Sequence, residues 1–142
     1  MTIAVDFDGT IVEDKYPDIG RELPFAIETL KKLQEEGHRL ILWSVREGES
    51  LQEAVDFCQE RGLKFWAVNG NFVNETADAI NYTRKIKADM FIDDRNLGGL
   101  PDWGIIYKMI HHKLAFEDIY SQVDIDHEQS QKKGFWGKMF SK

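Results

Sequence analysis

The sequence predicts an α/β domain built on a doubly wound, mainly parallel sheet of about five strands. Short apolar runs alternate with amphipathic helical patterns, as expected when crossover helices connect parallel strands. The apolar runs lack a regular polar–apolar alternation, which indicates strands that are buried on both faces. The 142 residues suit a single domain with one core. The predicted strands cover residues 3–8, 39–44, 64–68, 88–92 and 104–107.

The segments between these strands carry helix signals. The first helix is predicted to begin near Pro24, which fits a first helical turn, and to end at Gly37, which suits a C-terminal cap. The second is predicted to begin at Ser50 with a capping-box pattern and to end at Gly62. A short third helix is predicted over 78–86. Loops are predicted over 11–23, 69–74 and 97–104.

Composition narrows the classes of function. The formal net charge of −7 argues against a nucleic-acid partner, whose binding depends largely on phosphate neutralisation. No apolar run approaches the roughly 18 residues that a membrane span requires. The first residues lack the basic start of a secretory signal, and the single Cys58 precludes an internal disulfide framework. We therefore expect a protein of the cytoplasm.

Polar side chains gather where three of the predicted strands end. Asp6 and Asp8 end the first strand, Ser44 ends the second, and Asp93 with Asp94 follows the fourth. The carboxyl ends of parallel strands meet at one edge of the sheet, where such sheets bind ligands. The sequence therefore predicts one site to which three strand ends contribute.

The paired acids predict phosphoryl-transfer chemistry. The Asp6 carboxylate can attack a phosphoryl group and form an aspartyl-phosphate. Asp8 can protonate the leaving oxygen and then take a proton from water, and Gly9 permits the turn that brings both acids to one pocket. Asp93 and Asp94 would repel the first pair unless a cation joined them. Mg²⁺ fits, since it prefers a few carboxylates together with water and phosphate oxygens.

Three further positions are candidates for binding phosphate. The Ser44 hydroxyl can donate a hydrogen bond to a phosphate oxygen. Lys85 can neutralise developing phosphoryl charge, and Lys87 is a rival for that role. Arg46 lies two residues beyond Ser44 and can reach either the substrate phosphate or a leaving group, with a surface ion pair as its alternative role.

In their order along the chain, these motifs resemble the four motifs of the haloacid dehalogenase-like (HAD) hydrolase superfamily. The first is Asp-Phe-Asp-Gly-Thr at 6–10, followed by Ser44, Lys85 and Asp93-Asp94. The resemblance spans about residues 1–110 and implies a Rossmann-like fold, a bound Mg²⁺ and hydrolysis of a phosphomonoester. The aspartate at the second acid position of the first motif points to phosphatases rather than dehalogenases.

The resemblance also implies a role for each matching residue. Asp6 would be nucleophile and metal ligand, and Asp8 general acid and base, with its backbone carbonyl on the metal. Thr10 would steady the loop, Ser44 and Lys85 would bind phosphate, and Asp93 and Asp94 would complete the metal ligands, Asp94 directly or through water.

The spacing between the motifs leaves no room for a separate cap domain. The intervals from Asp8 to Ser44 and from Ser44 to Lys85 are each filled by predicted elements. We therefore expect a capless catalytic domain over 1–120, similar to a small bacterial subgroup of hydrolases, with 11–23 as a local flap. The expected substrate is a phosphorylated small molecule, and a second subunit could close the open site.

Two other classes of function are compatible with parts of the sequence. A non-catalytic phosphate-binding or regulatory domain would also gather acids at strand ends, but binding alone does not need a general acid such as Asp8. Receiver domains place their phosphoacceptor on the third strand, whereas here that strand ends at Val68 without an acid. The tail over 121–142 is basic and aromatic towards its end. It could contact a partner or a membrane surface, although a frayed or docked terminus is the simpler interpretation.

Overall fold

The computed structural model describes residues 1–73, 75 and 85–113. The chain divides into two compact units, Met1–Gly104 and Ile105–Lys142. The first unit holds the sheet, and residues 105–113 of the second are described. Among the described residues, no helix has the length and apolar character needed to cross a membrane. The predicted tail over 121–142 and the domain boundary near 120 lie outside the described residues.

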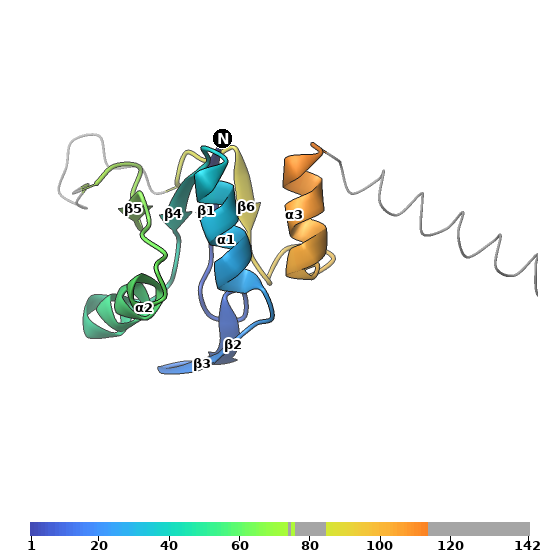
Figure 1. Ribbon diagram of the computed structural model, residues 1–142. Coiled ribbons are helices and arrows are strands. Elements are labelled where there is room, and N and C mark those ends of the chain that lie inside the picture. The colour runs from blue at the N-terminus through green and yellow to red at the C-terminus, as the bar shows by residue number, and fades with distance from the viewer. Residues whose placement is uncertain (74, 76–84, 114–142) are drawn as a thin grey trace, which may run out of the picture. The chain divides into compact units, whose positions relative to one another are not determined.

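A four-stranded parallel sheet forms the centre of the first unit. Its strands are β1 (Thr2–Val5), β4 (Arg39–Leu42), β5 (Ala67–Val68) and β6 (Met90–Ile92), in the spatial order β5-β4-β1-β6 (Figure 1). β1 pairs in parallel with β4 on one side and with β6 on the other. After β1, the chain forms β4 and β5 on one side of β1 and then crosses to form β6 on the other side. The predicted doubly wound α/β fold is confirmed, and its switch point lies between β1 and β6.

The two central strands, β1 and β4, are buried on both faces, as their apolar sequences predicted. Ile3 and Val5 point to one face of β1 and Ala4 to the other, because side chains alternate along a strand, and all three are at most 1% exposed. Ala4 joins a core cluster with Ile41, Ala67 and Ile86. Burial on both faces fixes the positions of the strand ends, which carry the candidate site.

Two helices and a hairpin surround this sheet. α1 (Ala26–Glu35) packs against β4, and α2 (Gly48–Glu60) follows β4 along the chain. β2 (Val12–Lys15) and β3 (Asp18–Glu22) form an antiparallel hairpin on the side to which the carboxyl ends of the strands point (Figure 1).

The hairpin replaces the polar loop that was predicted over 11–23. Its strands are mostly exposed, with Val12 buried and Ile19 partly buried. An antiparallel ladder held mainly by backbone hydrogen bonds leaves little hydrophobic pattern to detect, because few of its side chains enter a core.

The fifth predicted strand, 104–107, is also wrong: this segment belongs to helix α3 (Trp103–His111). A short apolar run cannot by itself distinguish a strand from a buried helix. The spacing of the buried Trp103, Ile106 and Ile110 is helical. The predicted loop over 97–104 accordingly ends at the start of α3.

Several element ends shift from the predicted positions. α2 begins at Gly48 rather than Ser50, whose hydroxyl donates to the Glu47 carbonyl at 2.9 Å instead of capping the helix. The third strand forms a ladder only at 67–68, and the fourth begins at Met90. The helix predicted over 78–86 falls almost wholly on residues outside the described ones.

Candidate active site

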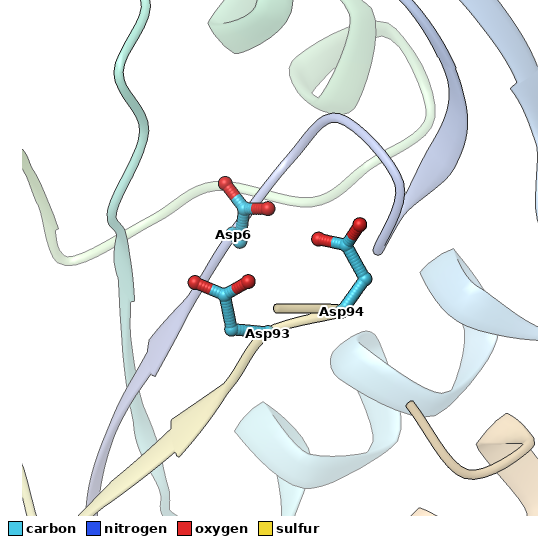
Figure 2. A group of neighbouring side chains, drawn as sticks. All are labelled: Asp6, Asp93 and Asp94. Carbon is cyan, nitrogen blue, oxygen red and sulfur yellow. The ribbon is translucent and has the colours of Figure 1, made fainter. Parts of the chain in front are cut away.

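Three carboxylates meet at the switch point of the sheet. Asp6 directly follows β1, and Asp93 and Asp94 directly follow β6. One carboxylate oxygen from each lies within 4.8 Å of those of the other two, and Figure 2 shows the three side chains turned towards a common centre. The Asp6 amide donates to the Ile92 carbonyl at 3.0 Å, which fixes the two strand ends in register. The predicted convergence of these three acids therefore occurs in the structure.

The loop after Asp6 is folded tightly around Asp94. Thr10 Oγ1 lies 3.3 Å from Asp6 Oδ2 and 3.3 Å from Asp94 Oδ1, so its proton can be donated to either carboxylate. The same oxygen accepts a hydrogen bond from the Asp94 amide at 3.1 Å. The Trp103 indole N–H donates to the Thr10 carbonyl at 3.0 Å from the other side of the loop. Thr10 is fully buried and connects both acidic strand ends, as expected for a residue that steadies the loop.

The electrostatics of the cluster favour a cation. Burial, and then the charges of Asp93 and Asp94, raise the pKa of Asp6 to about 7 from its ordinary value of 3.8. The carboxylates therefore repel one another when no counter-charge lies between them. Three carboxylate oxygens within reach of one another are a donor set of the kind that Mg²⁺ prefers. The residues present thus fit a hard divalent cation, held by Asp6, Asp93 and Asp94.

Ser44 is placed by Asn69, a residue for which the sequence predicted only a loop. The Ser44 amide donates to Asn69 Oδ1 at 2.7 Å, and the Asn69 side-chain amide donates to the Arg46 carbonyl at 3.4 Å. The Ser44 hydroxyl oxygen accepts from the Arg46 amide at 3.1 Å, which leaves its proton available to donate. Asn69 follows a two-residue strand and has a positive φ of 49°, so its sequence context indicated only a turn.

A cavity of about 240 Å³ opens beside the carboxylates. Asp6, Asp8, Ser44 and Asp93 all line it, so residues following three different strands face one space. The exposed side chain of Arg95 lines the same cavity and was not predicted as a site residue. Its position directly after Asp94 was visible in the sequence, but an arginine next to acids is more often a solvated surface charge. The remaining lining residues are Trp43 and Val45.

The Asp8 side chain is directed to Arg46 rather than to the three-carboxylate cluster. Arg46 Nε donates to Asp8 Oδ2 at 2.6 Å, and Nη2 donates to Asp8 Oδ1 at 2.7 Å. This bidentate pair is nearly buried, with side-chain exposures of 0% for Arg46 and 11% for Asp8. Arg46 therefore forms a buried ion pair with Asp8. It neither forms a surface ion pair nor reaches into the cavity, the two roles that the sequence predicted. This arrangement argues against the phosphate-binding role predicted for Arg46.

Neither candidate lysine is among the residues that line the cavity. Lys85 is exposed, and its Nζ lies 5.9 Å from the centroid of the Phe91 ring. Lys87 is exposed, and its backbone amide donates to Asn71 Oδ1 at 2.7 Å. The phosphate-binding role of Lys85, with Lys87 as the alternative, stays a prediction.

We expect Gly9→Ala to disrupt the cation site. Gly9 has a φ of +81°, and a Cβ at this position would collide with Asp94 Oδ2. Gly37→Ala is the matched control, since Gly37 has a φ of +92° and a Cβ there would meet no described atom within 4 Å. Both variants should lose about 1 kcal/mol of folding free energy through backbone strain, and Gly9→Ala should lose more because its Cβ also collides with Asp94. Only Gly9→Ala should also lose the increase in melting temperature produced by added Mg²⁺. An unchanged Mg²⁺ response in Gly9→Ala would contradict this geometry.

Comparison with known proteins agrees with the geometry. A family model described as haloacid dehalogenase-like hydrolase matches residues 3–93, a span that contains Asp6, Asp8, Ser44 and Asp93. A solved structure of a conserved protein from Bacteroides thetaiotaomicron is 65% identical. The match covers 84% of this chain and 97% of that one, with a TM-score of 0.80. No curated protein matches the chain. Because the family model covers more than half of the sequence, the chain belongs to the haloacid dehalogenase-like hydrolase family.

Proposed function

We propose that this hydrolase is a Mg²⁺-dependent phosphatase that cleaves phosphomonoesters through an aspartyl-phosphate on Asp6. The observation that carries the proposal is the cavity that Asp6, Ser44 and Asp93 line together at the carboxyl edge of the sheet. A carboxylate suited to act as nucleophile, a hydroxyl donor and a candidate metal ligand thus line a single space, which supports the proposal. Members of this family perform several kinds of hydrolysis, and the Asp8 carboxyl in the same cavity favours the phosphatase reaction.

In the first half of the reaction, an Asp6 oxygen attacks phosphorus and the bond to the leaving oxygen breaks. The leaving oxygen takes the electron pair of that bond and receives a proton from Asp8. The Ser44 hydroxyl donates to a phosphoryl oxygen and holds the group in line with Asp6. A partly buried nucleophile held by Thr10 needs little reorganisation at the moment of attack.

In the second half, water attacks the phosphorus of the aspartyl-phosphate. Asp8 accepts the proton of that water, and the phosphorus–oxygen bond to Asp6 breaks to release inorganic phosphate. Asp6 returns as a carboxylate and Asp8 as an acid, so the cycle closes. Mg²⁺, held by Asp6, Asp93 and Asp94 with the Asp8 backbone carbonyl as a further ligand, would screen the repulsion between nucleophile and phosphate and orient the phosphoryl group.

The dimensions of the site and the net charge of the protein favour a small substrate. A cavity of about 240 Å³ accommodates a phosphoryl group with a small organic portion. The net charge of −7 disfavours a nucleic acid, so a sugar phosphate, nucleotide or similar metabolite is the proposed class. We propose the cytoplasm, where such metabolites are made, as its location. A second copy of the chain could narrow the open side of the site.

One observation favours the alternative of a non-catalytic phosphate-binding domain. Asp8 is paired with Arg46 through both carboxylate oxygens, whereas a general acid must present its proton to the substrate. The two functions differ in turnover: the alternative predicts saturable phosphate binding without release of product.

A panel of phosphorylated metabolites, with an aryl phosphate as reference, tests the proposal. We expect wild type to release inorganic phosphate only with Mg²⁺. Asp8→Asn should lower kcat by about 10²-fold or more, the usual contribution of a general acid or base. The loss should be larger for alkyl phosphates than for the aryl phosphate, because poorer leaving groups depend more on protonation. Binding without turnover across the panel would support the non-catalytic alternative instead.

A further inference from the structure

Arg46 is the largest fully buried side chain in the described part of the protein. A guanidinium has five N–H donors and cannot lose its charge, so burying it requires a complete set of acceptors. Two donors go to the carboxylate of Asp8, at 2.6 and 2.7 Å. This bonding to Asp8 is the main reason that the pKa of Arg46 is raised further above its ordinary value.

The other three donors go to backbone carbonyls of two separate elements. Nη1 donates to the Pro17 carbonyl at 3.1 Å and to the Ser50 carbonyl at 3.2 Å. Nη2 donates to the Asp18 carbonyl at 2.8 Å. Pro17 and Asp18 lie at the tip of the β2–β3 hairpin, and Ser50 lies in α2. The guanidinium therefore has no donor left for a substrate phosphate.

Two aromatic rings also contact this guanidinium. Its central carbon lies 5.2 Å from the centroid of the buried Phe7 ring and 5.2 Å from that of Tyr16 on the hairpin. Phe7 in turn makes an edge contact with Phe57 of α2, with centroids 5.9 Å apart. A single side chain thus connects the loop that carries Asp8, the hairpin tip and α2. The planar, multidentate geometry of arginine makes such a connection rigid.

We propose that Arg46 is a positioning residue, which fixes the Asp8 side chain beside the cavity and anchors it to the tip of the β2–β3 hairpin. The inference rests on the proposed phosphatase function, in which Asp8 transfers protons. It assigns Arg46 a role through Asp8 rather than through contact with substrate. Proton transfer depends steeply on distance and alignment, so a loosened Asp8 would slow turnover even where substrate binding is unchanged.

This role makes a specific kinetic prediction. Arg46→Lys keeps the charge but cannot form the fork to Asp8, and Arg46→Met removes the charge at similar volume. We expect each to lower kcat on an aryl phosphate by about tenfold or more, with KM and the inhibition constant of inorganic phosphate within about twofold of wild type. In an Asp8→Asn background, Arg46→Met should change kcat by less than about threefold, because the residue through which it acts is already removed. Arg21→Lys, a change at an exposed arginine of the same hairpin, should leave both constants unchanged.

Other outcomes would overturn the inference. A rise of tenfold or more in KM and in the phosphate inhibition constant, with kcat retained, would show that Arg46 binds phosphate directly. Independent losses from Arg46→Met and Asp8→Asn that multiply in the double variant would show that Arg46 does not act through Asp8. Wild type without any turnover would overturn the proposed function, and this inference with it. An active wild type with the wrong pattern in the Arg46 variants would overturn this inference alone.

A measurement on the wild-type protein covers the case in which the Arg46 variants do not fold. Circular dichroism and thermal melting identify that case. The Arg46 Nε–H should then give an NMR signal that exchanges slowly with water and that keeps its position when inorganic phosphate is added in the presence of Mg²⁺. A fast-exchanging signal, or one that shifts progressively with phosphate up to saturation, would contradict the role.

Discussion

Replacing Asp6 by asparagine should reduce phosphate release by at least about 10⁴-fold, the size of effect seen when a covalent nucleophile is removed. An amide oxygen is a poor nucleophile towards phosphorus, and the substitution also removes one of the three converging carboxylates. The fold should persist, because the amide keeps the shape of the side chain and the Asp6 backbone bond to Ile92 is unaffected.

The measurement is release of inorganic phosphate from the aryl phosphate, combined with trapping of the phosphorylated enzyme by acid quench. Wild type should yield an acid-stable, hydroxylamine-sensitive phosphoenzyme, and Asp6→Asn and Asp6→Ala should not. Asp89→Asn is the matched control. Asp89 is an exposed acid just before β6, at the opposite edge of the sheet, where its Oδ2 accepts from the Thr2 amide at 2.7 Å. Full activity in Asp6→Asn would refute the assignment of the nucleophile.

Chelation of divalent cations should abolish activity, and Mg²⁺ should restore it with an affinity that rises with pH up to about 7. In the metal-free protein the pKa of Asp6 is raised to about 7, chiefly by burial and then by Asp93 and Asp94, so a proton competes with the cation. Below that value the apparent affinity should fall by about tenfold per pH unit, and above it the affinity should level off.

The raised pKa of Asp6 also makes the folding stability of the metal-free protein depend on pH. The folded pKa of Asp6 exceeds its ordinary value of 3.8, so the folded metal-free state takes up the proton more readily than the unfolded chain. The resulting stabilisation is present below about pH 4 and is lost as the pH rises through about 7. The contribution of Asp6 should therefore lower the melting temperature of the metal-free protein at pH 8 relative to pH 6. Added Mg²⁺, which binds more tightly at pH 8, should raise the melting temperature more at pH 8 than at pH 6.

Calorimetric titration of Mg²⁺ at several pH values between 5.5 and 8.5 measures the effect. In Asp6→Asn, which has no proton to displace at that position, binding should be weaker and its pH dependence between 5.5 and 7 should largely vanish. A wild-type affinity that is equal at pH 5.5 and pH 8.5 would contradict the competition between proton and cation.

The sequence predicted those parts of the protein that depend on local pattern. Buried apolar strands and amphipathic helices have recognisable periodicities, and the parallel arrangement places Asp6 and Asp93 at one edge. The hairpin and α3 were missed for opposite reasons. The hairpin buries few side chains, whereas the apolar start of α3 is compatible with either kind of element.

The hydrogen bonds of Arg46 are a feature of the site that could not be predicted from the sequence. Its acceptors come from Asp8, Pro17, Asp18 and Ser50, and three of these five bonds end on backbone carbonyls, which no side-chain pattern reveals. The role of Asn69 is similar, because its hydrogen bonds to Ser44 and Arg46 depend on a turn rather than on a motif. The sequence predicts which residues meet at the carboxyl edge of the sheet. The hydrogen-bond partners of each side chain are known only from the folded structure.

The contacts between Arg46 and the hairpin run to main-chain oxygens at Pro17 and Asp18. A substitution at an exposed side chain of the hairpin that does not contact Arg46, such as Lys15, leaves those oxygens in place. The link between the hairpin and the proposed proton-transfer group therefore runs through the main chain, and outward side chains of the hairpin that do not contact Arg46 should be replaceable without moving Asp8. In the proposed phosphatase, libraries that vary these outward side chains should therefore retain turnover.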